Sequence, residues 1–365
     1  MAHHLIHEGE FTAMAVSQVA IVGFGQFSLG LIATAVRTGA GNLQVLAWKC
    51  SDGNGLAGVH KIEQRGDASS GLISNSRVAI VTLAPDLLVT ATRDGAGKLS
   101  LTAWNVSQDG NQVIKKAQVT GDSIGSVAAC ESQGLVVTAV RDSAGNLQVI
   151  AWSVAPDGSA IIQRGSAPGG AVGKVTVVGF KYGVVTAARD SFDHLKVIAW
   201  VVSANGTQVK QGGNASGEAI SDVESAYFHS LVDVAGKNPR AVVTTAVTDR
   251  AGGLKVINWS VGENAGPLVT QLSSATGEKG VGAMAMTTVK TGMTTDRLVT
   301  AVRASGGNLE LRTWNGDGGQ MSSESTASAA GAIDKVAVGR VYGDYLVTAV
   351  RTDSGLLKLI GWHHV

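Results

Sequence analysis

The stretch "VVTAVRDSAGNLQVIAW", residues 136–152, is followed 48 residues later by "VVTAARDSFDHLKVIAW", residues 184–200. The same pattern occurs seven times in this chain of 365 residues. Each copy ends in one of the chain's seven tryptophans, which are Trp48, Trp104, Trp152, Trp200, Trp259, Trp314 and Trp362. Neighbouring tryptophans are 48 to 59 residues apart. A repeat period near fifty residues is typical of solenoids and propellers, so it decides the fold before any other motif is considered.

An arginine marks the middle of the repeated unit. It stands eleven residues before the tryptophan in six units, at Arg37, Arg93, Arg141, Arg189, Arg303 and Arg351, and Thr248 takes its place in the fifth unit. The run before this position is rich in Val, Thr and Leu. A cluster of Gly, Asn, Asp and Ser follows it, and then an alternating apolar run. This pattern predicts two strands joined by a tight turn.

Two further strands complete each unit. Asp-Gly or Asn-Gly turns follow the first four tryptophans, and these dipeptides supply the positive φ that tight hairpins need. A short outer strand comes next. Then follows a strand that begins at Val19, Val78, Val127, Val175, Val223, Val281 and Val336 in the successive units. Each unit is therefore predicted to contain four antiparallel strands, named here the inner, Arg, Trp and outer strands.

Seven such units without helical periodicity resemble a seven-bladed β-propeller, and the resemblance covers residues 1–365 as a single domain. It implies an all-β ring of four-stranded antiparallel blades, with the Val-led strand innermost. The last unit stops just after its Trp strand, whereas residues 4–9 match an outer strand. We therefore expect the N-terminal strand to join the C-terminal blade at residues 356–363 and to close the ring, which removes the exposed sheet edges.

Lectin-like propellers are the closest resemblance, because the WD-repeat and kelch signatures are missing. The resemblance concerns architecture and names no activity. A lectin-like propeller would place an aromatic ring in each blade to stack on a sugar. The tryptophans here lie within a strand at the end of an apolar alternation, which favours a role in the core between blades.

Composition excludes several partners. The net charge is +1 and no basic run is present, so nucleic acid is not an expected partner. No signal peptide and no run of 18 apolar residues occur, which predicts a cytoplasmic protein without a membrane partner. Cys50 and Cys130 fall in different units and are expected to be free buried thiols of a reducing compartment. Neither a cofactor nor a metal centre is predicted, and the oligomeric state is not specified.

The six arginines end their strands on one face of the expected ring. They form a candidate ligand-binding set there, because guanidinium groups bind anions or sugar hydroxyls through paired hydrogen bonds. The alternative is that each arginine ties its turn to a neighbouring carbonyl or to an acid such as Asp94, Asp142 or Asp190. Repetition is expected under both interpretations, so it does not decide between them.

Departures from the repeat form a second candidate site. Glu131, Tyr227 and Arg340 interrupt the fifth position of the inner strand, and Glu224 interrupts a second position that is otherwise small. These four side chains would converge on an axial pocket suited to proton abstraction or carboxylate recognition, or would line a water-filled channel. His194 stands at a turn where "SFDH" replaces "SAGN" and joins them as a candidate catalytic residue.

Two functions follow from these candidates. The first is a ligand-binding propeller for a small molecule or glycan, most simply a carbohydrate, with repeated sites between the blades. The second is an enzyme of lyase, hydrolase or cyclase/isomerase type, with one pocket at the central channel built from the non-repeating residues. The sequence does not choose between binding protein and enzyme.

Overall fold

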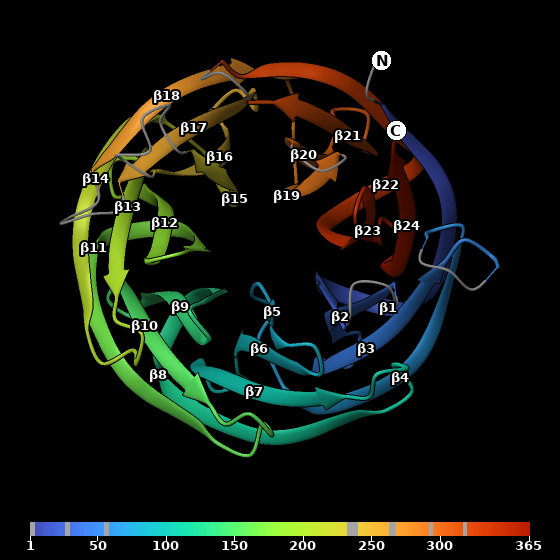
Figure 1. Cartoon of the computed structure of the whole chain (residues 1–365), viewed down its shortest axis with the longest axis horizontal. Helices are drawn as coiled ribbons and strands as arrows, with labels where there is room; N and C mark the ends of the chain where they lie inside the picture. Colours follow the sequence, from blue (N-terminus) through green and yellow to red (C-terminus); the bar gives the residue numbers. More distant parts are fainter. Residues whose placement is uncertain are drawn as a thin grey trace.

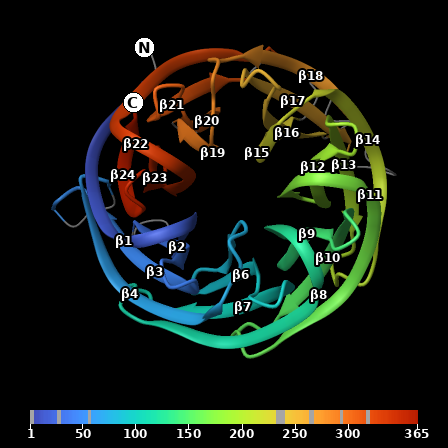
Figure 2. The same cartoon turned by 180° about the vertical axis from the view of Figure 1, so that it is seen from behind.

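A computed structural model describes residues 4–25, 30–54, 58–231, 240–262, 268–291, 295–316 and 320–365. The regular structure of these residues is all β-strand, in agreement with the predicted fold class. None of their segments is a helix able to cross a membrane. Seen down the shortest axis, the strands form a closed ring around a central opening (Figure 1), and the reverse view shows the same ring (Figure 2).

The strands are numbered in chain order. The first twelve are β1 Leu5–Phe24, β2 Leu31–Thr38, β3 Asn42–Ser51, β4 Lys61–Leu72, β5 Ala79–Ala84, β6 Leu87–Arg93, β7 Lys98–Val106, β8 Val113–Ser132, β9 Leu135–Asp142, β10 Asn146–Val154, β11 Ile161–Phe180 and β12 Gly183–Asp190. The others are β13 His194–Val202, β14 Val209–Ala219, β15 Asp222–Leu231, β16 Arg240–Thr248, β17 Leu254–Gly262, β18 Val269–Thr276, β19 Met284–Thr291, β20 Thr295–Arg303, β21 Asn308–Asn315, β22 Ser322–Tyr342, β23 Tyr345–Thr352 and β24 Leu356–His364.

Antiparallel pairing divides the described strands into seven groups of four, each arranged from the centre outward as inner, Arg, Trp and outer strand. Blade 1 is β1-β2-β3-β4, blade 2 is β5-β6-β7-β8, blade 3 is β8-β9-β10-β11, blade 4 is β11-β12-β13-β14, blade 5 is β15-β16-β17-β18, blade 6 is β19-β20-β21-β22 and blade 7 is β22-β23-β24-β1. Figure 1 shows these blades packed radially. The fold is a β-propeller.

Four strands belong to two blades each. β1, β8 and β11 are 20 residues long and β22 is 21 residues long, well beyond the usual strand length of about 3 to 10 residues. The first half of each is the outer strand of one blade, and the second half is the inner strand of the next. Blades 6, 7 and 1 therefore form one continuous sheet, as do blades 2, 3 and 4, whereas blade 5 is a separate four-stranded sheet.

The two ends of the chain meet in blade 7. β1 pairs with β24 from Leu5 opposite His364 to Ala15 opposite Leu356, so the pairing extends beyond the predicted residues. Two backbone hydrogen bonds of 3.0 and 2.9 Å between His4 and Val365 extend this pairing by one position. The N-terminal segment thus supplies the outer strand that the last repeat lacks.

The core lies between the blades. All seven tryptophans are at most 1% exposed, so their interpretation as core residues is confirmed and they are not available to stack on a ligand. Each indole N–H donates to the hydroxyl of a threonine 14 residues earlier, on the adjacent Arg strand, at 2.9 to 3.0 Å. The acceptors are Thr34, Thr90, Thr138, Thr186, Thr245, Thr300 and Thr348. The single polar atom of each large ring is thereby satisfied inside an apolar layer.

One predicted strand start is wrong. The inner strand of blade 6 was expected to begin at Val281, but β19 begins at Met284, which pairs with Val302. Val281 instead precedes the strand, and its N–H donates to the carbonyl of Gly252 in the neighbouring blade at 2.9 Å. Both Val281 and Met284 fit the apolar pattern of an inner strand, so the sequence alone placed the start of this strand three residues too early.

Both cysteines are free thiols, as expected. Cys50 is fully buried, and this burial raises the pKa of its thiol to about 12. Cys130 is partly exposed, and its thiol pKa is raised by desolvation first and by the charge of Glu131 second. Both thiols therefore remain protonated and unreactive near neutral pH.

The Trp–Thr pair yields a stability prediction. Thr138→Val keeps the shape of the side chain but leaves the buried indole N–H of Trp152 without an acceptor, which is expected to lower the free energy of unfolding by about 1–3 kcal/mol. Denaturant unfolding monitored by tryptophan fluorescence measures this change. Thr138→Ser retains the hydroxyl and serves as the control. Equal losses in the two variants would show that the hydrogen bond contributes little.

Candidate functional site

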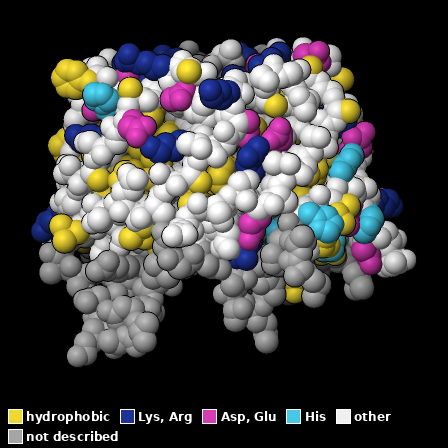
Figure 3. All heavy atoms as spheres, turned by 90° about the horizontal axis from the view of Figure 1, so that it is seen from above, with side chains coloured by type: hydrophobic (Ala, Val, Ile, Leu, Met, Phe, Trp, Pro, Cys, Tyr) yellow, Lys and Arg dark blue, Asp and Glu magenta, His cyan; other side chains and the backbone are white. Residues whose placement is uncertain are grey.

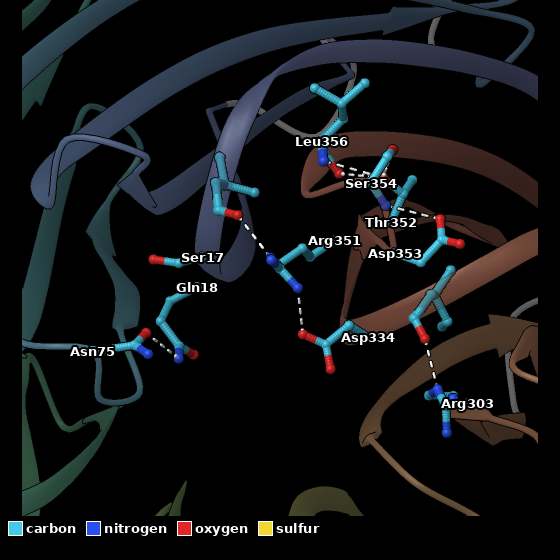
Figure 4. Close-up of polar contacts among 12 residues, drawn as sticks. Ser17, Gln18, Asn75, Arg303, Asp334, Arg351, Thr352, Asp353, Ser354 and Leu356 are labelled. Atoms are coloured by element: carbon cyan, nitrogen blue, oxygen red, sulfur yellow. Dashed lines mark hydrogen bonds and ion pairs between the residues drawn. The ribbon is translucent and has the colours of Figure 1, made fainter.

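The arginine series connects each blade to the next. In five of the six arginines, Nε donates to the backbone carbonyl of the residue that leads into the inner strand of the following blade. The pairs are Arg37 with Ile73 at 3.0 Å, Arg93 with Ile124 at 2.6 Å, Arg141 with Val172 at 2.8 Å, Arg303 with Ile333 at 2.7 Å and Arg351 with Val16 at 2.8 Å. Figure 4 shows the bonds made by Arg303 and Arg351.

The same receiving residues make a second bond. Their N–H groups donate to a carbonyl in the turn between the Arg and Trp strands of the preceding blade, at 2.7 to 2.9 Å, at all seven junctions. The acceptors are Gly355, Gly41, Gly97, Gly145, Asp193, Gly252 and Gly307. We call the two bonds together the clasp, and the receiving residues Val16, Ile73, Ile124, Val172, Ile220, Val281 and Ile333 the clasp residues. The arginines therefore tie neighbouring blades through backbone carbonyls. The acids expected as alternative partners, such as Asp94, instead accept N–H groups of their own turn.

Both junctions of blade 5 lack the arginine half of the clasp. Arg189 of blade 4 has no hydrogen-bond partner for its buried Nε among the described residues, and its Nη1 lies 3.5 Å from Asp193. Thr248 replaces the arginine in blade 5. A surface ion pair of 2.9 Å between Arg250 and Asp193 links blades 4 and 5 instead.

The centre of the ring holds a cavity of about 660 Å³. Inner strands form its walls, largely with small side chains such as Ala128 and Ala337. Charged residues line one end of the cavity. Six lie at or near the start of an inner strand, namely Arg77, Lys174, Asp222, Glu224, Asp334 and Lys335, and Arg303 lies at the end of β20. Glu224 is only 7% exposed and is paired with Arg77 at 2.7 Å.

Of the candidate catalytic residues, only Glu224 lines this cavity. Glu131 accepts the N–H of Gly134 at 2.8 Å, and Arg340 donates from Nε to the carbonyl of Gly343 at 3.0 Å, so each holds the turn that follows its own inner strand. Tyr227 packs against the apolar cluster between blades 4 and 5. His194 is exposed at the start of β13. The structure does not bring these five residues together.

Strand geometry explains the separation. The second and fifth positions of an inner strand are three residues apart, which corresponds to roughly 10 Å along the strand and to opposite faces of it. Glu224 pairs with Ala246 near one end of the ring axis, whereas Tyr227 pairs with Val243 toward the other. The repeat pattern correctly placed Glu131, Glu224, Tyr227 and Arg340 on inner strands. It did not show that Glu224 lies at a different level along the ring axis from the other three.

A second cavity, of about 440 Å³, lies between blades 2 and 3. It is lined by Asp122, Ser123, Asp142, Ser143, Asn146, Leu147, Gln148, Pro168 and Gly169. We call it the 2/3 cleft. Leu147 forms its buried apolar floor. One oxygen of Asp142 accepts the N–H of Asn146 at 2.7 Å, which fixes the turn at its edge.

The framework of this cleft recurs in other blades, whereas its polar groups recur only in part. A glycine lies against the equivalent leucine in neighbouring blades, as Gly121 does on Leu99 and Gly217 on Leu195. At Gly169 an added Cβ would approach the side chain of Leu147 to 3.0 Å, so the wall tolerates little more than glycine. The position equivalent to Gln148 carries Ser100 in blade 2 and Lys196 in blade 4, whereas blade 1 repeats the glutamine as Gln44. Blade 1 has Thr38 in place of Asp142, so the two acids and two amides occur together at the 2/3 cleft.

Sequence reasoning missed the residues of the 2/3 cleft and also Arg77. The acidic and amide side chains of the cleft come from two units and appear unremarkable within each repeat. Arg77 had a visible signal, because the segment before Val78 contains two more residues than the matching segment of the next unit. On the flank of the ring, side chains of both charges are interspersed, in keeping with the low net charge (Figure 3).

Comparisons with known proteins extend the structural result. No protein-family model matches the chain, and no curated protein matches it. The WD40 domain from Toxoplasma gondii coronin superposes with a TM-score of 0.57 at 13% identity, covering 100% of this chain and 89% of that one. U3-55K gives 0.56 at 14% identity, with 97% and 99% coverage. The SapL1 lectin in complex with alpha methyl fucoside gives 0.51 at 11% identity, with 87% and 97% coverage. At these identities the likeness concerns the propeller fold alone.

The clasp predicts unequal effects of the same substitution in adjacent blades. Arg141→Met removes a charge-assisted donor from the carbonyl of Val172 and is expected to destabilise the protein by about 1–3 kcal/mol. Arg189→Met is the matched control, because its Nε has no partner to lose, and a clearly smaller loss is expected. Denaturant unfolding of both variants provides the comparison. A larger loss for Arg189→Met would contradict the assigned role of the clasp.

Proposed function

We propose that this protein is a ligand-binding propeller that recognises carbohydrate in the 2/3 cleft. The observation that supports the proposal most directly is the composition of that cleft. Its volume of about 440 Å³ accommodates a sugar unit or two, and its polar side chains project into it from two blades. No enzyme is proposed, because the candidate catalytic residues lie apart.

The polar groups of the cleft suit hydroxyl recognition. A sugar hydroxyl both donates and accepts hydrogen bonds. The carboxylates of Asp122 and Asp142 accept, and the amides of Asn146 and Gln148 do both. Among the described residues, no group donates to the carboxylate of Asp122 and the amide of Gln148 has no hydrogen-bond partner, so both are available to a ligand. Planar carboxylate and amide groups on either side of one hydroxyl provide directional recognition of a neutral ligand.

The apolar part of the cleft supports the same ligand class. Leu147 forms the floor and exposed Pro168 lies at the margin. Together they offer a surface for the C–H face of a pyranose, a role that the buried tryptophans cannot fill. The six arginines remain candidate ligand contacts. Nε of five of them is committed to the clasp, so these five would contact a ligand through Nη atoms.

The number of carbohydrate sites per chain follows from which parts of the 2/3 cleft recur in other blades. The glycine and leucine framework recurs at other blade junctions, whereas the combination of two acids with two amides is found at the 2/3 cleft. The proposal therefore gives one principal site per chain, with weaker binding in the related clefts. The SapL1 complex with alpha methyl fucoside makes fucosides a reasonable first group of sugars to test.

A glycan array followed by titration calorimetry tests the proposal. The array is expected to identify at least one glycan, and calorimetry should then give about one strong site per chain. The double variant Asp122→Asn with Gln148→Ala should weaken binding about tenfold or more, because it removes one charged acceptor and one amide from the cleft.

Lys196→Ala is the matched control, since it changes the position equivalent to Gln148 in blade 4. It is expected to leave the principal affinity unchanged. An array without any bound glycan would contradict the carbohydrate assignment. Equal binding by the double variant and the wild type would instead place the site outside the 2/3 cleft.

A further inference from the structure

Two departures from the repeat meet at the centre of the ring. In six blades the inner strand begins three positions after the clasp residue, as from Val172 to Val175. In blade 2 the same step, from Ile73 to Val78, takes five positions. The two additional residues create a loop, residues 74–78, which we call the strap. Glu224 is the second departure, because the other blades have a small residue at its position.

An ion pair joins these two departures across the ring. Nη2 of Arg77 lies 2.7 Å from Oε2 of Glu224, although the two residues are 147 positions apart and belong to blades 2 and 5. The strap is held at its base, where Gln18 of blade 1 donates to Asn75 at 3.1 Å (Figure 4). Figure 1 shows the segment that leads into β5 reaching toward the central opening. The strap therefore brings a guanidinium group over the central cavity.

The carboxylates of the cavity already have partners. Glu224 is paired with Arg77 and lies 3.8 Å from Lys174, which is also paired with Asp222. Asp334 is bound by Arg351 at 2.5 Å (Figure 4). These contacts leave none of the three lining carboxylates without a cation.

The cations of the cavity are not all neutralised. Nη1 of Arg77 is buried and has no hydrogen-bond partner among the described residues. Nε of Arg303 donates to the carbonyl of Ile333, whereas its Nη atoms and the ammonium group of Lys335 have no hydrogen-bond partner among the described residues. Four cationic and three anionic side chains line the cavity. Unmet donors and excess positive charge both favour an anion there.

We propose that the central cavity is a binding site for a small organic or inorganic oxyanion, a carboxylate or a phosphate. Arg77 from the strap would bind it on one side, with Lys335 and the Nη groups of Arg303 as further ligand contacts. Small wall residues such as Ala128 and Ala337 leave a cavity of about 660 Å³, which fits a metabolite of a few carbon atoms. Glu224 occupies Arg77 when no ligand is bound and so competes with the anion.

Titration calorimetry at low ionic strength tests this site with succinate and with inorganic phosphate as the two probes. At least one probe is expected to bind once per chain, with an affinity that falls as salt is added. The probe that binds identifies the source of the oxyanion as a carboxylate or a phosphate. Binding by neither probe overturns the proposal.

Three substitutions test the assigned contacts, because two are expected to weaken anion binding and one is expected to strengthen it. Arg77→Gln and Lys335→Gln each remove a cation and should weaken binding by about tenfold. Glu224→Gln removes the competing charge and should strengthen binding by about threefold or more. If the Arg77–Glu224 ion pair had a purely structural role, Glu224→Gln would lower the stability of the protein without tightening anion binding. Unchanged or weaker binding by a folded Glu224→Gln variant therefore overturns the proposal.

Further variants separate loss of the anion site from misfolding and from loss of the carbohydrate site. Lys335 is exposed and pairs with none of the described side chains, so Lys335→Gln remains informative where Arg77→Gln fails to fold. Unchanged affinity in Lys335→Gln contradicts its assigned contact and overturns the site as proposed. Lys196→Gln removes a lysine outside the cavity and should bind like the wild type. The double variant of the 2/3 cleft should also bind the anion normally, which separates this site from the proposed carbohydrate site.

Discussion

The ring depends on how each blade holds the next. A four-stranded blade has two apolar faces and cannot bury either of them alone, so its stability comes from its neighbours. The clasp fixes that contact at one end of every junction. The clasp residue donates its backbone N–H to a turn carbonyl of the preceding blade, and at five junctions its own carbonyl accepts from an arginine Nε of that blade. The guanidinium group satisfies a carbonyl of the next blade, and this use explains why the arginine recurs with a constant offset from the tryptophan.

The buried tryptophans impose a second constraint on the same hairpin. Each ring fills the layer between blades, and its N–H is satisfied by a threonine on the adjacent strand. The clasp and the Trp–Thr bond together account for the tryptophan and threonine that all blades share and for the arginine that six of them share. Shared residues are therefore occupied with holding the ring, and binding must rely on side chains that vary between blades or on atoms that the ring leaves unused.

The varying residues gather at two places. The 2/3 cleft uses the common glycine and leucine framework and adds acids and amides to it. The central cavity combines an inserted strap in blade 2 with an acid in blade 5. Blade 5 is also the blade whose two junctions lack the arginine bond and whose strands form a separate sheet. Its connection to the ring rests on side-chain packing, the backbone half of the clasp and ion pairs, among them those of Arg250 with Asp193 and of Lys174 with Asp222.

The sequence by itself determined the repeat, the four strands in each unit, the pairing of the N-terminal strand with β24 and the burial of the tryptophans. These features depend on local pattern and fixed spacing, which one chain displays completely. Only the tertiary structure decided the roles of the varying residues. Glu224 and Arg77 are 147 residues apart, and nothing in either repeat indicates that they form a pair. Glu131 and Tyr227 share the inner strands with Glu224 but lie at another height, since alternation and rise along a strand separate positions that look adjacent in an alignment.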